Sequence, residues 1–299
     1  QQLGSILKND SRGHRLLAGA DGDIIRRFDA TARIMLSQCG SWGDPGTNSA
    51  RWLLYQPANG IRRLLEDNED IESMLLGRLH WFGHLGTTLT SYGTLSQLTG
   101  LDHTDLLPPY LPAGRGEDIL FGTMLQQLHP RSPVLNEGWS IRHQPLESRD
   151  ERSTLDPLEV KPELALLIDW LGEMPAEESS ASPLKTLHRI ADRISRLSTM
   201  EPDTLQVLAS RRLLGKQSAL LGRCLEQLHQ ITKLESLPGT KRWQRFLEES
   251  RDSLTTAIQS PEPDLLEVHL NRNGHNLSWL RAMGLRLSQS LKDWPEIRD

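Results

Sequence analysis

The chain has little cysteine, no long hydrophobic run and no excess of positive charge. Its 299 residues include two cysteines, Cys39 and Cys224, which lie far apart and form no CxxC pair. This spacing excludes a zinc knuckle and a disulfide framework, and it favours a reducing compartment. No apolar segment approaches the roughly 20 residues needed to cross a bilayer. We therefore expect a cytoplasmic protein without a membrane span.

The net charge of −5 comes from 34 basic and 39 acidic side chains. A chain of this charge has no general attraction to nucleic acid or to an anionic membrane, so we predict no nucleic-acid partner. Basic pairs such as the one at 211–212 have acids nearby and are typical of solvated helix faces. The sequence begins Gln1-Gln2 without a methionine or a signal peptide, which leads us to expect a processed product or a piece of a longer protein.

The second half of the chain has the pattern of a helical domain. Apolar residues recur at helical spacing over 164–171, 187–197, 213–231, 246–258 and 277–291. Proline and small polar residues separate these stretches. The short connections predict about five antiparallel helices in an up-and-down bundle. If the chain has a protein partner, we expect it to bind this domain.

The first half is rich in glycine and proline, and it predicts shorter elements. We expect helices over 22–39, 51–65 and 71–85, strands over 87–92 and 136–143, and an extended, proline-fixed segment over 106–112. The polar segment 148–154 marks the predicted domain boundary. The predicted fold class is mainly α (α+β), with a partial α/β region over 1–150 and a helical bundle over 151–299.

The segment 106–125, LLPPYLPAGRGEDILFGTML, is the most informative part of the sequence. Its proline-rich loop leads to a Gly-Arg-Gly turn at 114–116, and Glu117 and Asp118 follow at the start of an apolar helical run. Unpaired amides and the helix dipole stabilise acids at a helix N-terminus, so Asp118 can be a capping acid and nothing more. That interpretation does not account for the glycines, which allow a ligand to approach the backbone closely.

Three other places carry candidate ligands. His143 ends a predicted strand, although a lone histidine is more often structural than a metal ligand. Asp21 and Asp23 form an Asp-x-Asp pair, which can hold a divalent cation but is also common in turns. Asp44 lies in a Gly-Asp-Pro-Gly turn and could also face a ligand.

A series of short motifs runs through the first half in this order: Gly43-Asp44-Pro45-Gly46, Gly100-Leu101-Asp102, the LLPPYLP segment at 106–112, Arg115-Gly116-Glu117-Asp118, Phe121-Gly122 and His143-Gln144-Pro145. The series resembles a family of bacterial glycosyltransferase-like proteins that are related to sugar-nucleotide transferases of the GT-A type. The resemblance covers about residues 20–146. It implies the acceptor-side part of a GT-A domain, so that either the chain is the C-terminal part of a longer protein or the site is a remnant.

The resemblance also implies a reaction, the transfer of a sugar from a nucleotide-sugar donor to an unknown acceptor. In GT-A enzymes an Asp-x-Asp pair binds Mn or Mg on the donor diphosphate, and a later Glu-Asp pair supplies the base that deprotonates the acceptor. Carried over, Asp118 is the base and Glu117 orients the acceptor. The remaining roles fall on Arg115, Gly116 and Asp44 as substrate contacts and on His143, Asp21 and Asp23 as metal ligands.

Two other functions remain open. The chain can be a non-catalytic interaction or scaffold protein whose first half keeps a remnant site. A hydrolase that uses Glu117 and Asp118 as paired carboxylates is less favoured, because neighbouring residues on a helix point in different directions. A transferase should place Asp118, His143 and Asp44 around one cleft, whereas an interaction protein should expose an apolar groove on its helical bundle.

Overall fold

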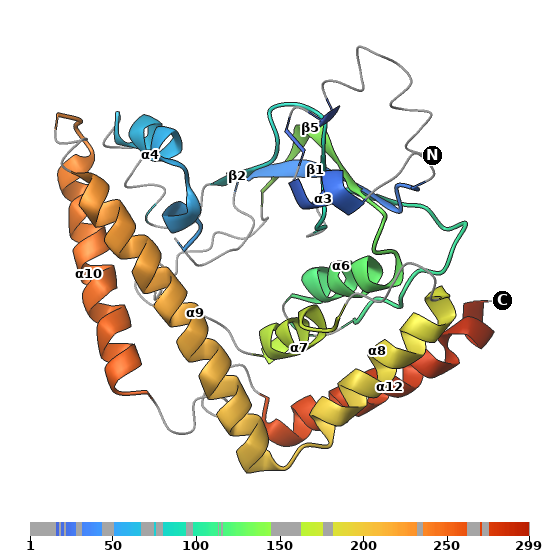
Figure 1. The fold of residues 1–299 in the computed structure, drawn as a ribbon. Helices are drawn as coiled ribbons and strands as arrows, with labels where there is room; N and C mark the ends of the chain where they lie inside the picture. The colour runs from blue at the N-terminus through green and yellow to red at the C-terminus, as the bar shows by residue number, and fades with distance from the viewer. Residues whose placement is uncertain are drawn as a thin grey trace.

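A small mixed sheet lies among long, paired helices (Figure 1). The computed structural model describes residues 16–17, 19–20, 22–27, 32–43, 51–66, 75, 80–93, 98–112, 114, 116–144, 163–175, 182–231, 236–261, 270 and 275–298. Most of these residues are helical and the strands join in one sheet, so the predicted mainly α (α+β) class is confirmed. Within these ranges, every helix is too short or too polar to cross a membrane.

The sheet is built around two parallel strands, β1 (Leu36–Gly43) and β5 (Val134–His143). Leu36 lies opposite Val134 and Gly43 lies opposite His143, so both strands end at the same edge. The other strands are antiparallel additions: β2 (His80–Phe82) to the end of β1, β4 (Thr99–Leu101) to its start, and β3 (Thr88–Thr90) to the start of β5. The parallel pair therefore brings Gly43 and His143 to one edge of the sheet.

Helix α6 (Glu117–Leu128) packs across the beginning of the two parallel strands. Its Phe121 and Leu125 are buried in a cluster that also contains Met35, Leu36, Leu107 and Val134. Gly122 faces the backbone next to β3, where a Cβ atom at position 122 would lie 2.1 Å from the carbonyl oxygen of Gly93. The close approach leaves room for glycine alone, and it fixes the height of α6 above the sheet.

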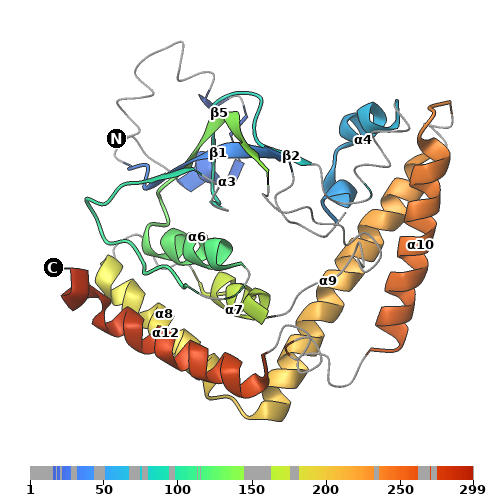
Figure 2. The same ribbon diagram turned by 180° about the vertical axis from the view of Figure 1, so that it is seen from behind.

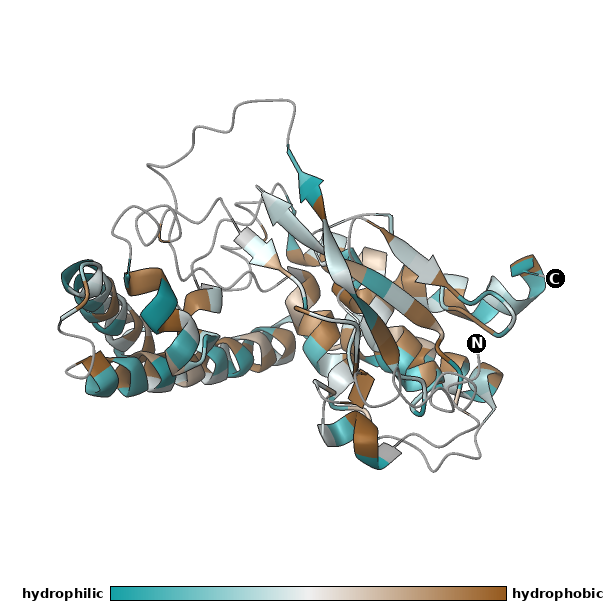
Figure 3. Cartoon of the chain, turned by 90° about the horizontal axis from the view of Figure 1, so that it is seen from above, coloured by the Kyte–Doolittle hydropathy of each residue, from teal (hydrophilic) through white to brown (hydrophobic). Residues whose placement is uncertain are grey.

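The long helices form two antiparallel pairs. In one, α8 (Pro183–Ser198) packs against α12 (Leu277–Arg298), and in the other α9 (Pro202–Gln230) packs against α10 (Thr240–Gln259). Both views show the pairs diverging from the turn between α8 and α9, with the sheet, α6 and α7 (Glu163–Gly172) between them (Figures 1 and 2). Hydrophobic and hydrophilic turns alternate along α9 and α10 (Figure 3), as expected for helices with one buried face.

Two hydrophobic clusters hold these layers together, and α9 contributes to both. Leu205 and Ala209, near its start, belong to a cluster built from α6, α7, α8 and α12. Leu213, Leu220 and Cys224 pack with α10 and with the helical segments η1 (Arg51–Tyr55) and α4 (Ala58–Leu65). The predicted boundary at 148–154 lies outside the described residues. Both clusters combine residues from before and after it, so the two halves of the chain share their cores.

Several predicted elements are confirmed: the helices of the second half, the helical segment 51–65 (interrupted at Pro57), the strands near 87–92 and 136–143, and the extended segment 106–112. The helix predicted over 22–39 is confirmed at α3 (Gly22–Arg27) and wrong over 32–39, because residues 32–35 are not helical and 36–39 belong to the central strand β1. The helix predicted over 71–85 is wrong at 80–82, which pairs with β1 as β2. The predicted up-and-down order of the bundle also differs from the structure, because α8 packs mainly against α12 and not against α9, the next helix in sequence.

Candidate functional site

The proline-fixed loop before α6 is attached to the C-terminal helix. Trp294 of α12 donates from Nε1 to the carbonyl oxygen of Leu107 at 2.7 Å, and Arg298 donates to the carbonyl oxygen of His103 at 3.0 Å. The ring nitrogen Nε2 of His129, at the end of α6, lies 2.7 Å from the carbonyl oxygen of Leu106. These contacts come from segments far apart in sequence, and they hold the chain that leads into α6.

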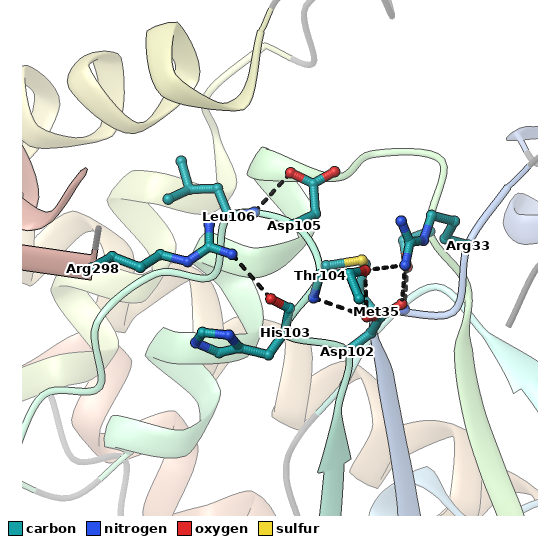
Figure 4. Close-up of polar contacts among 9 residues, drawn as sticks. Arg33, Met35, Asp102, His103, Thr104, Asp105, Leu106 and Arg298 are labelled. Carbon is teal, nitrogen blue, oxygen red and sulfur yellow. Dashed lines mark hydrogen bonds and ion pairs between the residues drawn. The ribbon is translucent and has the colours of Figure 1, made fainter. Parts of the chain in front are cut away.

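The start of this loop is fixed by a polar network around Asp102 (Figure 4). Arg33 forms an ion pair with the Asp102 carboxylate at 2.6 Å and also bonds the hydroxyl of Thr104. The backbone amide and hydroxyl of Thr104 donate to the same carboxylate at 3.0 and 2.6 Å. The hydrogen bonds from Thr104, together with Arg33, hold the pKa of Asp102 far below its usual range. Asp102 is thus a structural anchor at the end of β4.

We expect the Asp102→Asn variant to be less stable than the wild type, with a difference that depends on pH. Because the pKa of Asp102 is lower in the folded state, its ionised carboxylate stabilises the fold. This stabilisation is fully present above the ordinary pKa of 3.8 and is lost as the pH falls toward the folded-state pKa. The difference in thermal unfolding midpoint between the wild type and Asp102→Asn should therefore be constant above about pH 5 and become smaller below pH 4. Asp252→Asn, at an exposed position on α10, is the matched control. A gap that widens in acid would contradict the account.

A turn with two glycines in left-handed conformations leads into α6. Gly114 has φ +86° and Gly116 has φ +95°, a region that favours glycine. A Cβ atom at position 114 would lie 2.9 Å from a side-chain carbon of Leu164, so α7 packs directly on this turn. The Gly116 carbonyl then accepts the first helical hydrogen bond, from the amide of Leu120 at 2.9 Å. The predicted substrate contact Gly116 is therefore the N-cap of α6, and Arg115 lies outside the described residues.

The predicted catalytic acids Glu117 and Asp118 form the first turn of α6, and both are half-buried. Asp118 accepts a 2.7 Å hydrogen bond from the amide of Ile119, so part of its role is to cap the helix. Tyr110 and Tyr92 lie near the two acids. Burial raises the pKa of Tyr110, and the negative charges of Glu117 and Asp118 raise it further. The pKa of Tyr92 is also raised by burial, and Asp118 contributes to that shift as well.

Tyr92 connects these acids to a cleft of about 810 Å³ between α6, α7 and α9. This volume is within the range of small-molecule sites. The cleft wall carries both signs of charge: Asp169 pairs with Lys216 at 2.7 Å, and Glu173 pairs with Arg212. The negative charge of Asp169 also raises the pKa of Tyr92, which lines the same cleft. This arrangement can bind a polar ligand next to a carboxylate.

The other predicted site residues lie elsewhere. His143 is the last residue of β5, whereas α6 packs on Val134, the first residue of that strand. Gly43 has φ +112° and lies against the carbonyl oxygen of His143 at one edge of the sheet. Asp44 and Asp21 themselves lie outside the described residues, and Asp23 is exposed in the first turn of α3. No group of three side chains suited to a metal ion occurs among the residues that the structure describes.

No protein-family model matches the chain, and comparisons with curated proteins and with solved structures find no match either. Tyr92 lines the cleft, whereas Glu117 and Asp118 are not among its lining residues, and His143 lies at the far end of β5.

The sequence alone did not point to the charged wall of the cleft. Arg212 and Lys216 lie on α9, and Asp169 and Glu173 lie on α7. Each of these residues occurs in an amphipathic helical pattern, where charges are expected on the solvated face. They form one wall because two distant helices meet, and no local motif indicates that meeting. Tyr92 follows a short strand, and no motif around it predicts a place in a binding site.

Proposed function

We propose that the chain takes part in transferring a sugar from a nucleotide-sugar donor to an acceptor hydroxyl, with Asp118 as the general base. The observation that carries the proposal is the position of Asp118, half-buried at the start of α6 and close to a tyrosine that lines an 810 Å³ cleft. The cleft has polar and charged groups suited to a hydroxylated acceptor. The order of motifs that resembles GT-A transferases supports the same interpretation.

The proposed reaction forms one bond and breaks one. The acceptor oxygen attacks the anomeric carbon of the donor sugar while Asp118 takes the hydroxyl proton, and the bond from that carbon to the diphosphate oxygen breaks. The nucleoside diphosphate leaves with the bonding electrons. Glu117 would orient the acceptor, and Arg115, Gly116 and Asp44 would contact the substrates.

A divalent cation, Mn or Mg, would offset the charge of the leaving diphosphate. The proposed ligands are His143, Asp21 and Asp23. Imidazole and carboxylate groups suit such an ion, but His143 lies at the far end of β5 from α6. The described residues on their own do not complete a three-ligand group.

A second function, a non-catalytic interaction protein, is favoured by one observation. Asp118 accepts the amide hydrogen bond of Ile119, which is what a purely structural capping acid does. On this alternative the cleft would hold no substrate, and the paired helices would carry the binding surface.

Calorimetric titration with uridine and guanosine diphosphates, with and without manganese, tests the proposal. We expect binding that requires the metal, and we expect His143→Ala to raise the metal concentration needed by about tenfold or more, because the ion loses a ligand. His188→Ala, at an exposed position on α8, is the matched control and should behave as the wild type. Binding that is the same with and without manganese would remove the metal from the proposal. If His143→Ala needs the same metal concentration as the wild type, His143 is not a metal ligand.

A further inference from the structure

Two exposed tryptophans lie side by side where β1 and β5 end. Trp42 of β1 is the direct cross-strand neighbour of Trp81 of β2, and Arg142 of β5 lies opposite Trp42 on the other side. Residues that face each other across strands point to the same side of a sheet, so the three side chains form a row. The exposed fraction is 43% for Trp42 and 47% for Trp81. The row therefore presents two large aromatic rings to solvent.

Both rings are held in place by polar contacts. The Nε1 atom of Trp81 donates a 3.0 Å hydrogen bond to the hydroxyl of Ser140. That hydroxyl fits because its cross-strand neighbour is Gly40, where a Cβ atom would lie 2.3 Å from the Ser140 oxygen. The guanidinium carbon of Arg142 lies over the Trp42 ring, 5.0 Å from its centre, and so covers one face of that ring. Since the rings are already ordered, a ligand that stacks on them pays little side-chain entropy.

We propose that this row, the tryptophan platform of Trp42, Trp81, Ser140 and Arg142, binds a hexopyranose ring of a carbohydrate. The negative face of an indole attracts the weakly positive C–H groups on the flat side of such a ring. Neighbouring strands lie about 4.8 Å apart, which is close to the width of one six-membered sugar ring. Arg142 provides donors for the hydroxyl groups at the edge of the ring.

The size and charge of the platform favour this occupant over a macromolecule. A stable protein interface buries roughly 800 Å² on each partner, whereas an indole side chain supplies about 150–250 Å² even when fully covered. A nucleic-acid surface needs several cations, and the described residues of the platform supply one guanidinium on a chain with a net charge of −5. The platform lies at the end of β5 and the acids of α6 lie near its start, so this proposal does not depend on Asp118 as a base.

The test is calorimetric titration of the full chain with soluble pentasaccharides of glucose, N-acetylglucosamine and mannose. We expect at least one of them to bind, and we expect Trp42→Ala and Trp81→Ala to weaken that binding about tenfold or more. Tyr55→Ala is the matched control, because Tyr55 is 56% exposed, lies on η1 and has Arg223 over its ring. Its affinity should equal that of the wild type.

If either alanine variant fails to fold, Trp81→Phe keeps an aromatic face and should retain most of the affinity. The proposal is overturned if none of the pentasaccharides binds at millimolar concentration, or if binding is the same in the wild type and in both tryptophan variants. It is also overturned if the platform instead joins two copies of the chain, which sedimentation would detect as a concentration-dependent dimer that is lost in Trp81→Ala.

Discussion

We expect Asp118→Asn to slow the release of nucleoside diphosphate from a nucleotide sugar by about 100-fold or more, because a general base contributes that much to the rate. The amide oxygen of asparagine can still accept the hydrogen bond from Ile119, so the cap of α6 and the unfolding midpoint should change little. The loss should appear in kcat more than in KM, since the carboxylate acts on the acceptor proton in the transition state.

The matched control for this variant is Asp203→Asn. Asp203 is also an acid in the first helical turn, at the start of α9, and it is exposed and away from the cleft. It should keep the wild-type rate. If Asp118→Asn turns over at nearly the wild-type rate, Asp118 is a capping acid and the proposed base is wrong.

The largest expected effect on stability comes from Gly122→Ala. The added methyl group would lie 2.1 Å from the carbonyl oxygen of Gly93, a backbone atom that cannot turn away. Helix α6 must then shift, at a cost of about 1–3 kcal/mol in the free energy of unfolding. Chemical denaturation followed by circular dichroism measures this difference.

Gly222→Ala provides the comparison for that variant. Gly222 lies inside α9, and a Cβ atom there would meet nothing within 4 Å. Alanine in a helix interior is more favourable than glycine by roughly 0.5–1 kcal/mol, so this variant should be slightly stabilised. Equal effects of the two substitutions would show that the contact between α6 and Gly93 does not hold the helix in place.

The elements with strong local signals could be predicted from the sequence. The prolines at 108, 109 and 112 exclude a helix, the glycines and acids at 114–118 mark a helix start, and both features occur where they were expected. The periodic apolar residues of the second half likewise form helices. In each case neighbouring residues are enough to decide the structure.

The elements that depend on distant partners could not be predicted. Leu36–Cys39 fits a helical pattern, but these residues become a strand because β5 and β4 pair with them from far along the chain. Similarly, residues 80–82 become a strand through pairing with Ser41–Gly43. Tertiary pairing overrides the local preference in both segments.

The same distinction applies to the candidate site. Glu117 and Asp118 follow a readable motif, whereas Asp169, Arg212 and Lys216 enter the cleft only because α7 and α9 pack together. The tryptophan platform likewise joins β1, β2 and β5. Its residues are scattered over about 100 positions of sequence, and their register brings them into one row.

The most direct test of the central claim is whether the wild-type chain releases nucleoside diphosphate from UDP- or GDP-sugars in the presence of manganese or magnesium. A panel of these donors, with diphosphate release measured over time, needs no knowledge of the acceptor because water can replace it slowly. The account predicts metal-dependent release from at least one donor, lost in Asp118→Asn and kept in Asp203→Asn. Release from none of the donors, by a chain that is folded and carries its metal, would contradict it.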